Sequence, residues 1–114
     1  MIPMIQTNED ETPPDRLAAA RAHYAALMAG NKNAWEATLA PDVHPTTKYY
    51  WWKEGADWIK SGARYAFHHY DPNQANKEKS WIFFERAQAD GTKKLVHLHL
   101  FAKDGAWWVT NVSY

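Results

Sequence analysis

The amino-acid sequence predicts one α+β domain, in which N-terminal helices pack on a curved, mostly antiparallel sheet. Helix-forming segments occupy the first half of the chain, and segments rich in β-branched and aromatic residues occupy the second half. The pairs Asp90-Gly91 and Asp104-Gly105 are strong signals for tight turns between neighbouring strands. Helices that precede strands joined by tight turns are typical of the α+β class.

The length of 114 residues is that of one domain. Residues 1–11 are polar and acidic after a short apolar start, so we expect a flexible lead-in there and a single folded domain over residues 12–114. The chain has no cysteine, which excludes disulfides, thiolate zinc sites and nucleophilic thiols, and which suits a reducing compartment. We therefore expect a cytoplasmic protein.

Charge and hydropathy argue against two classes of partner. Thirteen Lys and Arg residues balance thirteen Asp and Glu residues without a concentrated basic stripe, so we expect no binding to nucleic acid. No apolar run approaches the ~18 residues of a membrane span, so we expect no partner in the membrane. The formal net charge of zero gives little repulsion against self-association.

Two helices are predicted before residue 42. The first begins after Thr12, which can cap it, because the prolines at 13 and 14 suit the first helical positions. It ends at Gly30, and the second helix begins at Asn31 or Asn33 and ends at Pro41. Two helices joined by so short a link must fold back on each other.

The rest of the chain is predicted to be mainly sheet. Residues 46–52 are rich in β-branched and aromatic side chains, which favour a strand. Residues 54–63 are predicted to form a third, short helix that presents Trp58 and Ile59 on one side. The strands expected after it cover residues 64–70, 80–88, 94–103 and 107–114.

The strand predicted at 94–103 carries apolar groups on both faces, because side chains alternate along a strand. One face holds Leu95, His97, His99 and Phe101, and the other holds Val96, Leu98, Leu100 and Ala102. A strand in a sheet with one solvent-exposed face would show polar residues at every second position. Helices can cover one face, and we expect a second subunit to cover the other, which predicts a homodimer formed through the sheet face.

Three segments of this chain carry a family resemblance. They are residues 23–42, which include His23-Tyr24-Ala25 and Pro41-Asp42, the hairpin at 80–103, and the closing segment 104–114. The chain resembles the nuclear transport factor 2-like superfamily, which has a cystatin-like fold and includes ketosteroid isomerases, scytalone dehydratase and polyketide cyclases. The likeness in element order covers residues 12–114. It implies a cone-shaped half-barrel with a cavity between the helices and the concave sheet, commonly in a homodimer.

The resemblance also implies a role for Tyr24. Ketosteroid isomerases place a tyrosine near the end of the first helix as an oxyanion donor, and Tyr24 or its neighbour His23 occupies that stretch. They place a base aspartate shortly after the second helix, at a position that falls near Thr47. Residues 44–48 contain no carboxylate, so that isomerase mechanism is not expected here.

His97 and His99 are the main candidates for catalytic residues. Residues two apart on a strand project to the same face, so both imidazoles can converge on one point and transfer protons near neutral pH. Tyr24, on the apolar face of the first helix, is expected to stabilise a developing negative charge. Two alternatives are that the histidines line a polar subunit interface, or that they form hydrogen bonds inside a mixed core.

A metal site is a weaker interpretation of the same histidines. His68 or His69 on a neighbouring strand, together with Glu85, could complete a ligand set or orient an imidazole. The spacing in the sequence does not fix a third and a fourth ligand. We therefore predict no metal and no cofactor.

Trp58, Phe83, Trp108 and Tyr114 are candidates for the walls of a ligand cavity, and ordinary core packing is the alternative for each ring. Two functions follow. One is a pocket protein for a small, largely apolar, aromatic or cyclic molecule, with cofactor-free isomerisation, dehydration or cyclisation if it is an enzyme. The other is a non-catalytic module, in which the aromatic sheet face docks a second copy or another protein.

Overall fold

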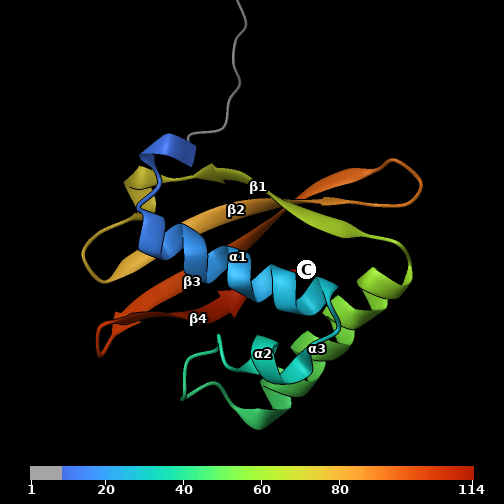
Figure 1. Cartoon of the computed structure of the whole chain (residues 1–114), viewed down its shortest axis with the longest axis horizontal. Helices are drawn as coiled ribbons and strands as arrows, with labels where there is room; N and C mark the ends of the chain where they lie inside the picture. The colour runs from blue at the N-terminus through green and yellow to red at the C-terminus, as the bar shows by residue number, and fades with distance from the viewer. Residues whose placement is uncertain (1–8) are drawn as a thin grey trace, which may run out of the picture.

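The computed structural model describes residues 9–114 and shows helices followed by an antiparallel sheet, so the predicted α+β class is confirmed (Figure 1). Two short 3₁₀ turns, η1 (Glu9–Glu11) and η2 (Pro72–Gln74), accompany the main elements. Residues 1–8 of the predicted lead-in lie outside the described residues. The helices are α1 (Pro14–Met28), α2 (Lys32–Glu36) and α3 (Pro45–Lys60), and the strands are β1 (Arg64–Tyr70), β2 (Lys79–Ala87), β3 (Lys93–Lys103) and β4 (Ala106–Val112).

The four strands form one sheet in the order β1-β2-β3-β4, and each neighbouring pair is antiparallel. The two Asp-Gly pairs lie in the turns that join β2 to β3 and β3 to β4, as predicted. Gly91 has a φ of 90° and Gly105 a φ of 78°, which is the left-handed backbone that tight hairpin turns require. Register shifts between Phe67 and His69 and between His99 and Leu100 interrupt the ladders.

The first two helices begin near the predicted positions, but α2 ends at Glu36, before the predicted end at Pro41. Thr12 does not cap α1. Pro13 occupies the N-cap position of this helix, without a side-chain hydrogen bond to it, and Thr12 is buried. Gly30 has a φ of 70° and follows the end of α1. The Asn31 side chain accepts a hydrogen bond from the backbone N–H of Ala34 and caps α2.

The strand predicted at residues 46–52 is wrong, because these residues form the first half of α3. Pro45 fits the first helical turn, and Nδ1 of His44 accepts a hydrogen bond of 3.1 Å from the backbone N–H of Thr46. The preference of aromatic and β-branched residues for strands reflects packing on a pleated surface more than a preference of the backbone. The helix-start signal at Pro45 therefore outweighed the strand-like composition of residues 46–52. The short helix predicted at 54–63 corresponds to the second half of α3.

Gly55 lies inside α3 at the point where this helix approaches Leu27 and Tyr114. A Cβ atom on Gly55 would lie 2.8 Å from Cδ1 of Leu27 and 3.3 Å from Cδ1 of Tyr114. Glycine in a helix interior costs about 1 kcal/mol relative to alanine. Here the missing side chain lets α3 pack closely on α1 and on the segment that follows β4.

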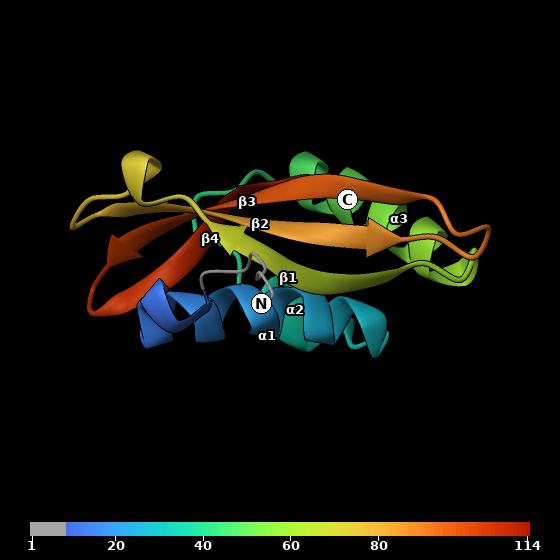
Figure 2. The ribbon, with the colours of Figure 1, turned by 90° about the horizontal axis from the view of Figure 1, so that it is seen from above.

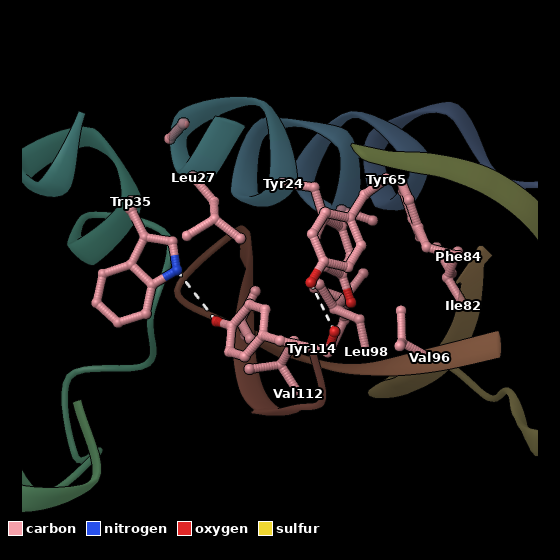
Figure 3. Packing of buried hydrophobic residues seen from close by; sticks show 14 of the residues in the cluster. Tyr24, Leu27, Trp35, Tyr65, Ile82, Phe84, Val96, Leu98, Val112 and Tyr114 are labelled. Atoms are coloured by element: carbon pink, nitrogen blue, oxygen red, sulfur yellow. Dashed lines mark hydrogen bonds between the residues drawn. The ribbon is translucent and has the colours of Figure 1, made fainter. Parts of the chain in front are cut away.

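The molecule consists of two layers, and its shortest dimension is 18 Å. Helices α1 and α2 lie on one side of the sheet (Figure 2). We call the sheet face that packs on α1 the inner face and the opposite face the outer face. The core lies on the inner face, where buried strand residues meet α1 (Figure 3). Among them are Tyr65, Ile82, Phe84, Val96, Leu98, Leu100, Val109 and Val112, packed with Ala20, Tyr24 and Leu27.

None of the helices within residues 9–114 combines the length and the apolar character that crossing a bilayer requires.

Candidate functional site

The space between α1 and the inner face is filled by side chains in the described chain, where the sequence predicted an aromatic-lined cavity (Figure 3). Tyr24, Trp35 and Tyr114 lie there with at most 1% of their surface exposed. The Tyr24 ring stacks on Tyr65 with centroids 4.9 Å apart and contacts Phe84 at 4.4 Å. Because the rings pack on one another, they form a core on this side of the sheet.

A buried hydrogen-bond network joins the end of the chain to α1 and α2. The hydroxyl of Tyr114 lies 2.6 Å from Nε2 of His23, and Nε1 of Trp35 donates to the same hydroxyl at 3.1 Å. Nδ1 of His23 lies 2.7 Å from Oγ1 of Thr38. Each of these buried polar atoms therefore has a partner, as stability requires.

The network determines which nitrogen of His23 carries the proton. Oγ1 of Thr38 donates its own proton to the carbonyl of Trp35, so it accepts from Nδ1 of His23. Nε2 of His23 then accepts from the hydroxyl of Tyr114. Burial lowers the pKa of His23 to about 3, which keeps this imidazole neutral near pH 7.

Tyr24 uses its hydroxyl within the core. It donates to the backbone carbonyl of Ser113 at 3.1 Å, and burial together with the nearby Tyr114 and Tyr65 raises its pKa well above the ordinary value. An oxyanion donor needs its proton directed at a bound molecule. The hydroxyl of Tyr24 is directed at the protein's own backbone.

Arg86 is the buried cation of the inner face, with 8% of its surface exposed. Its guanidinium lies 3.7 Å from the ring centroid of Trp58, and Nη1 donates to the backbone oxygen of Tyr114 at 2.6 Å. Nε and Nη2 donate to Oε1 of Gln88. These contacts hold α3 and the segment after β4 against β2.

The outer face presents rings and imidazoles that are only partly buried. Its central residues alternate with the buried inner residues along β2 and β3, and they face one another across the strands. The set consists of His69 on β1, Trp81, Phe83 and Glu85 on β2, and Leu95, His97, His99 and Phe101 on β3. Leu95 is 48% exposed. This set is the candidate functional surface.

His97 and His99 do lie together, as predicted, with ring centroids 4.9 Å apart. Trp81 stacks on His99 with centroids 3.5 Å apart. Burial, and then the neighbouring His97, lower the pKa of His99 to about 4, so this imidazole is neutral near pH 7. Nδ1 of His97 lies 3.1 Å from Oγ of Ser113, whereas Nε2 of His99 is buried without a hydrogen-bond partner in the described chain.

The other two histidines of the sheet lie on β1. Nδ1 of His68 and Nδ1 of His69 are 2.7 Å apart, and the ring of His69 stacks on Phe83 with centroids 4.5 Å apart. Burial and the neighbouring His68 lower the pKa of His69. Within residues 9–114, no group of three His, Asp or Glu side chains is placed to hold a metal ion.

A surface hollow of about 470 Å³ opens beside the outer face. It is lined by Trp81, His99 and Phe101, with Lys79 and Asp42 at its polar side. Drug-sized ligands occupy pockets of roughly 300–1,000 Å³. This hollow brings an imidazole, two aromatic rings and two charged groups together.

The structure does not bring the predicted catalytic trio together, because Tyr24 lies on the inner side of the sheet and His97 and His99 lie on the outer face. A strand has two faces, and the sequence predicted the strand but not which face α1 would cover. One bound molecule therefore cannot contact Tyr24 and the histidine pair at once.

The four predicted wall residues are also divided between the two faces. Trp58 and Tyr114 meet at Arg86 on the inner side, whereas Phe83 lies on the outer face. Trp108 on the edge strand β4 is paired with Phe101 of the outer face, and its Nε1 donates to the backbone oxygen of Lys103. These residues do not line one common cavity.

Sequence reasoning missed Trp81 and Arg86. Trp81 and Phe83 are two residues apart on β2 and therefore project to the same face, and this spacing is visible in the sequence. Its pairing with His99 depends on the register between β2 and β3, which local sequence does not determine. The burial of Arg86 depends on Trp58, which α3 supplies from another part of the chain.

No protein-family model and no curated protein matches the sequence. The structure is similar to that of a protein of unknown function with a cystatin-like fold from Nostoc punctiforme, with a TM-score of 0.63 and 12% identity, over 96% of this chain and 92% of that one. It is also similar to a protein from Xanthomonas campestris that is named as a calcium/calmodulin-dependent protein kinase II association domain, with a TM-score of 0.58 and 14% identity, over 94% and 89% of the two chains.

A third similar structure is that of a Campylobacter jejuni protein named as a nuclear transport factor 2-like transpeptidase. Its TM-score is 0.57 and its identity 13%, over 88% of this chain and 99% of that one. Identities this low show a shared fold and leave the chemistry of each protein to its own site. The chain therefore has the cystatin-like α+β fold of the nuclear transport factor 2-like proteins, as its sequence predicted.

Proposed function

We propose that this protein is a non-catalytic association module that forms a homodimer through the outer face. The observation that carries the proposal is the composition of this face, where Trp81, Phe83 and Leu95 surround imidazoles. A sheet face that meets only water is expected to show polar residues at these positions. Aromatic rings are enriched in the buried centres of protein interfaces.

Electrostatics supports a second copy of this chain as the partner. The formal net charge is zero, and the lowered pKa values of His69 and His99 keep these imidazoles uncharged near pH 7. Two such faces can therefore approach without burying like charges at their centre. One of the proteins with a similar structure is named as an association domain, which agrees with this function.

The mass of the full chain in solution tests the proposal. Sedimentation velocity at micromolar concentration is expected to give twice the chain mass of 13.2 kDa. Phe83→Asp should give a monomer that keeps its far-UV circular dichroism, because a carboxylate would be buried at the centre of the interface. Tyr49→Asp is the matched control, since Tyr49 is 59% exposed and lies in α3. A monomeric wild-type protein would refute the function.

The hollow beside the outer face supports a second candidate function, the binding of a small aromatic or cyclic molecule. His99 lines this hollow, and its buried Nε2 has no hydrogen-bond partner within residues 9–114. Trp81 and Phe101 offer surfaces for stacking. Proton transfer by His99 and His97 within this hollow would be the catalytic form of the same proposal.

A thermal-shift screen of aromatic acids, lactones and steroids tests this second function, because a ligand that binds only the native state raises the melting temperature. The shift should disappear in His99→Ala. It should persist in His44→Ala, because His44 lies at the start of α3. Equal shifts in both variants would place the ligand elsewhere.

A further inference from the structure

Lys79 and Glu85 lie on the outer side of β2, one toward each end. They are six residues apart, which is about 20 Å along a strand. Trp81 and Phe83 lie between them on the same face. The Lys79 side chain is exposed and that of Glu85 is half-buried, and neither belongs to an ion pair formed within residues 9–114.

The neighbouring strand gives each end an apolar residue as well. Phe101 is paired with Lys79, and Leu95 is paired with Glu85. The cross-strand pair at one end is therefore basic and aromatic, and the pair at the other end is acidic and aliphatic. The change from the basic pair to the acidic pair runs along the strand direction.

A homodimer that stacks two outer faces about a twofold axis can take two orientations, because sheets pack with their strands nearly aligned. If the strands of the two copies run parallel and the axis passes over β2, Lys79 faces its own equivalent and Glu85 faces its own equivalent. If they run antiparallel, each Lys79 faces the Glu85 of the other copy. The first orientation makes two like-charge contacts, and the second makes two attractive contacts.

We propose that two copies stack outer face on outer face with antiparallel strands, so that Lys79 of each copy pairs with Glu85 of the other. The inference rests on the proposed homodimer and adds its orientation. The same arrangement places Leu95 of one copy opposite Phe101 of the other, so an aliphatic and an aromatic side chain meet at each end. A twist of about 30° between the sheets displaces each end by about 5 Å, which flexible Lys and Glu side chains can span.

The other charged groups on this face do not favour either orientation. Lys93 and Lys103 stand at the two ends of β3, beyond the Lys79 and Glu85 positions. In the antiparallel orientation Lys93 of each copy faces Lys103 of the other. In the parallel orientation with the axis over β2, Lys93 of each copy faces Arg64 of the other, because Arg64 is paired with Ala87 in the same row as Lys93. Both orientations therefore make two further contacts between exposed cations, whose repulsion is screened by salt. Asp42 lies in the hollow beside Lys79 at the border of the face.

Charge reversal tests the orientation. In the antiparallel dimer, Lys79→Glu creates two Glu–Glu contacts and Glu85→Lys creates two Lys–Lys contacts, so each variant should weaken dimerisation about tenfold or more. The double variant Lys79→Glu/Glu85→Lys restores both attractive pairs and should return the dissociation constant to within a few-fold of the wild-type value. Sedimentation equilibrium at low salt measures all three constants.

The parallel orientation predicts a different pattern. There, Lys79→Glu replaces one like-charge contact with another and leaves the dissociation constant nearly unchanged. Lys32→Glu, on α2, is the control for a change of net charge alone. A wild-type dimer whose dissociation constant is unaffected by the single reversals, or is not restored by the double reversal, would overturn the orientation and leave the dimer intact. A monomeric wild type would overturn both.

Discussion

The hydroxyl of Tyr114 lies 2.6 Å from Nε2 of His23 and connects the segment after β4 to the middle of α1. Both side chains are buried, and Trp35 contributes a second partner to the same hydroxyl. The contact explains why the inner side of the sheet is a core. A polar group that points into this space finds its partner within the chain, and the rings that carry these groups fill the volume.

Removal of the Tyr114 hydroxyl should destabilise the protein. Tyr114→Phe leaves Nε2 of His23 and Nε1 of Trp35 buried without partners, at a cost of about 2–4 kcal/mol in the free energy of unfolding. Tyr49→Phe, at an exposed position, should change that free energy by less than about 0.5 kcal/mol. Urea unfolding at pH 7 measures both, and equal stabilities would show that the network contributes little.

Stability should fall steeply as the pH drops below 6.5. The pKa of His23 is about 3 in the folded protein, whereas an exposed histidine in the unfolded chain titrates near 6.5. Between these values the unfolded chain binds the extra proton, so His23 alone removes about 1.4 kcal/mol per pH unit as the pH falls. His99, whose pKa is lowered to about 4, acts in the same direction between pH 6.5 and 4.

The variant His23→Gln isolates this contribution, because glutamine does not titrate and can still donate to Thr38 and accept from Tyr114. Urea unfolding at pH 7 and at pH 5 should show a smaller loss of stability in the variant than in the wild type. If both proteins lose the same free energy between these pH values, His23 does not control the acid sensitivity.

An added methyl group at Gly55 should destabilise the protein even though alanine is the better helix former. The gain in helix propensity is about 1 kcal/mol, but the new Cβ would meet the buried Leu27 side chain at 2.8 Å. Overpacking of this kind costs about 1–3 kcal/mol. We expect a lower melting temperature for Gly55→Ala, and partial recovery when Leu27→Val removes a methylene group. A stabilised single variant would show that Leu27 can move away.

Arginine at position 86 should not be replaceable by lysine. Arg86→Lys keeps the positive charge but loses the planar group that stacks on Trp58 and donates to both Tyr114 and Gln88. We expect a loss of about 2 kcal/mol in the free energy of unfolding. Arg64→Lys is the matched control on β1, because Arg64 is exposed and, among residues 9–114, its side chain donates only to the adjacent Ala63 carbonyl. Chemical denaturation of both variants, followed by tryptophan fluorescence, makes the comparison.

The sequence by itself determined the elements whose signals are local. The Asp-Gly pairs produce hairpins because glycine adopts positive φ at no cost, and Asn31 caps α2 because its side chain reaches the backbone of Ala34. The alternation in β3 predicted two apolar faces, and the structure shows one face buried and the other half-buried. The order of helices and strands was sufficient to indicate the fold.

Only the tertiary structure decided which side chains meet. The position of α1 on the sheet placed Tyr24 in the core and left His97 and His99 on the opposite face. The start of α3 at Pro45 turned a predicted strand into a helix, which brought Trp58 over Arg86 and Gly55 against Leu27. These contacts join residues that are distant in the chain. Their energy comes from burial and pairing in three dimensions, which the local propensity of a segment does not predict.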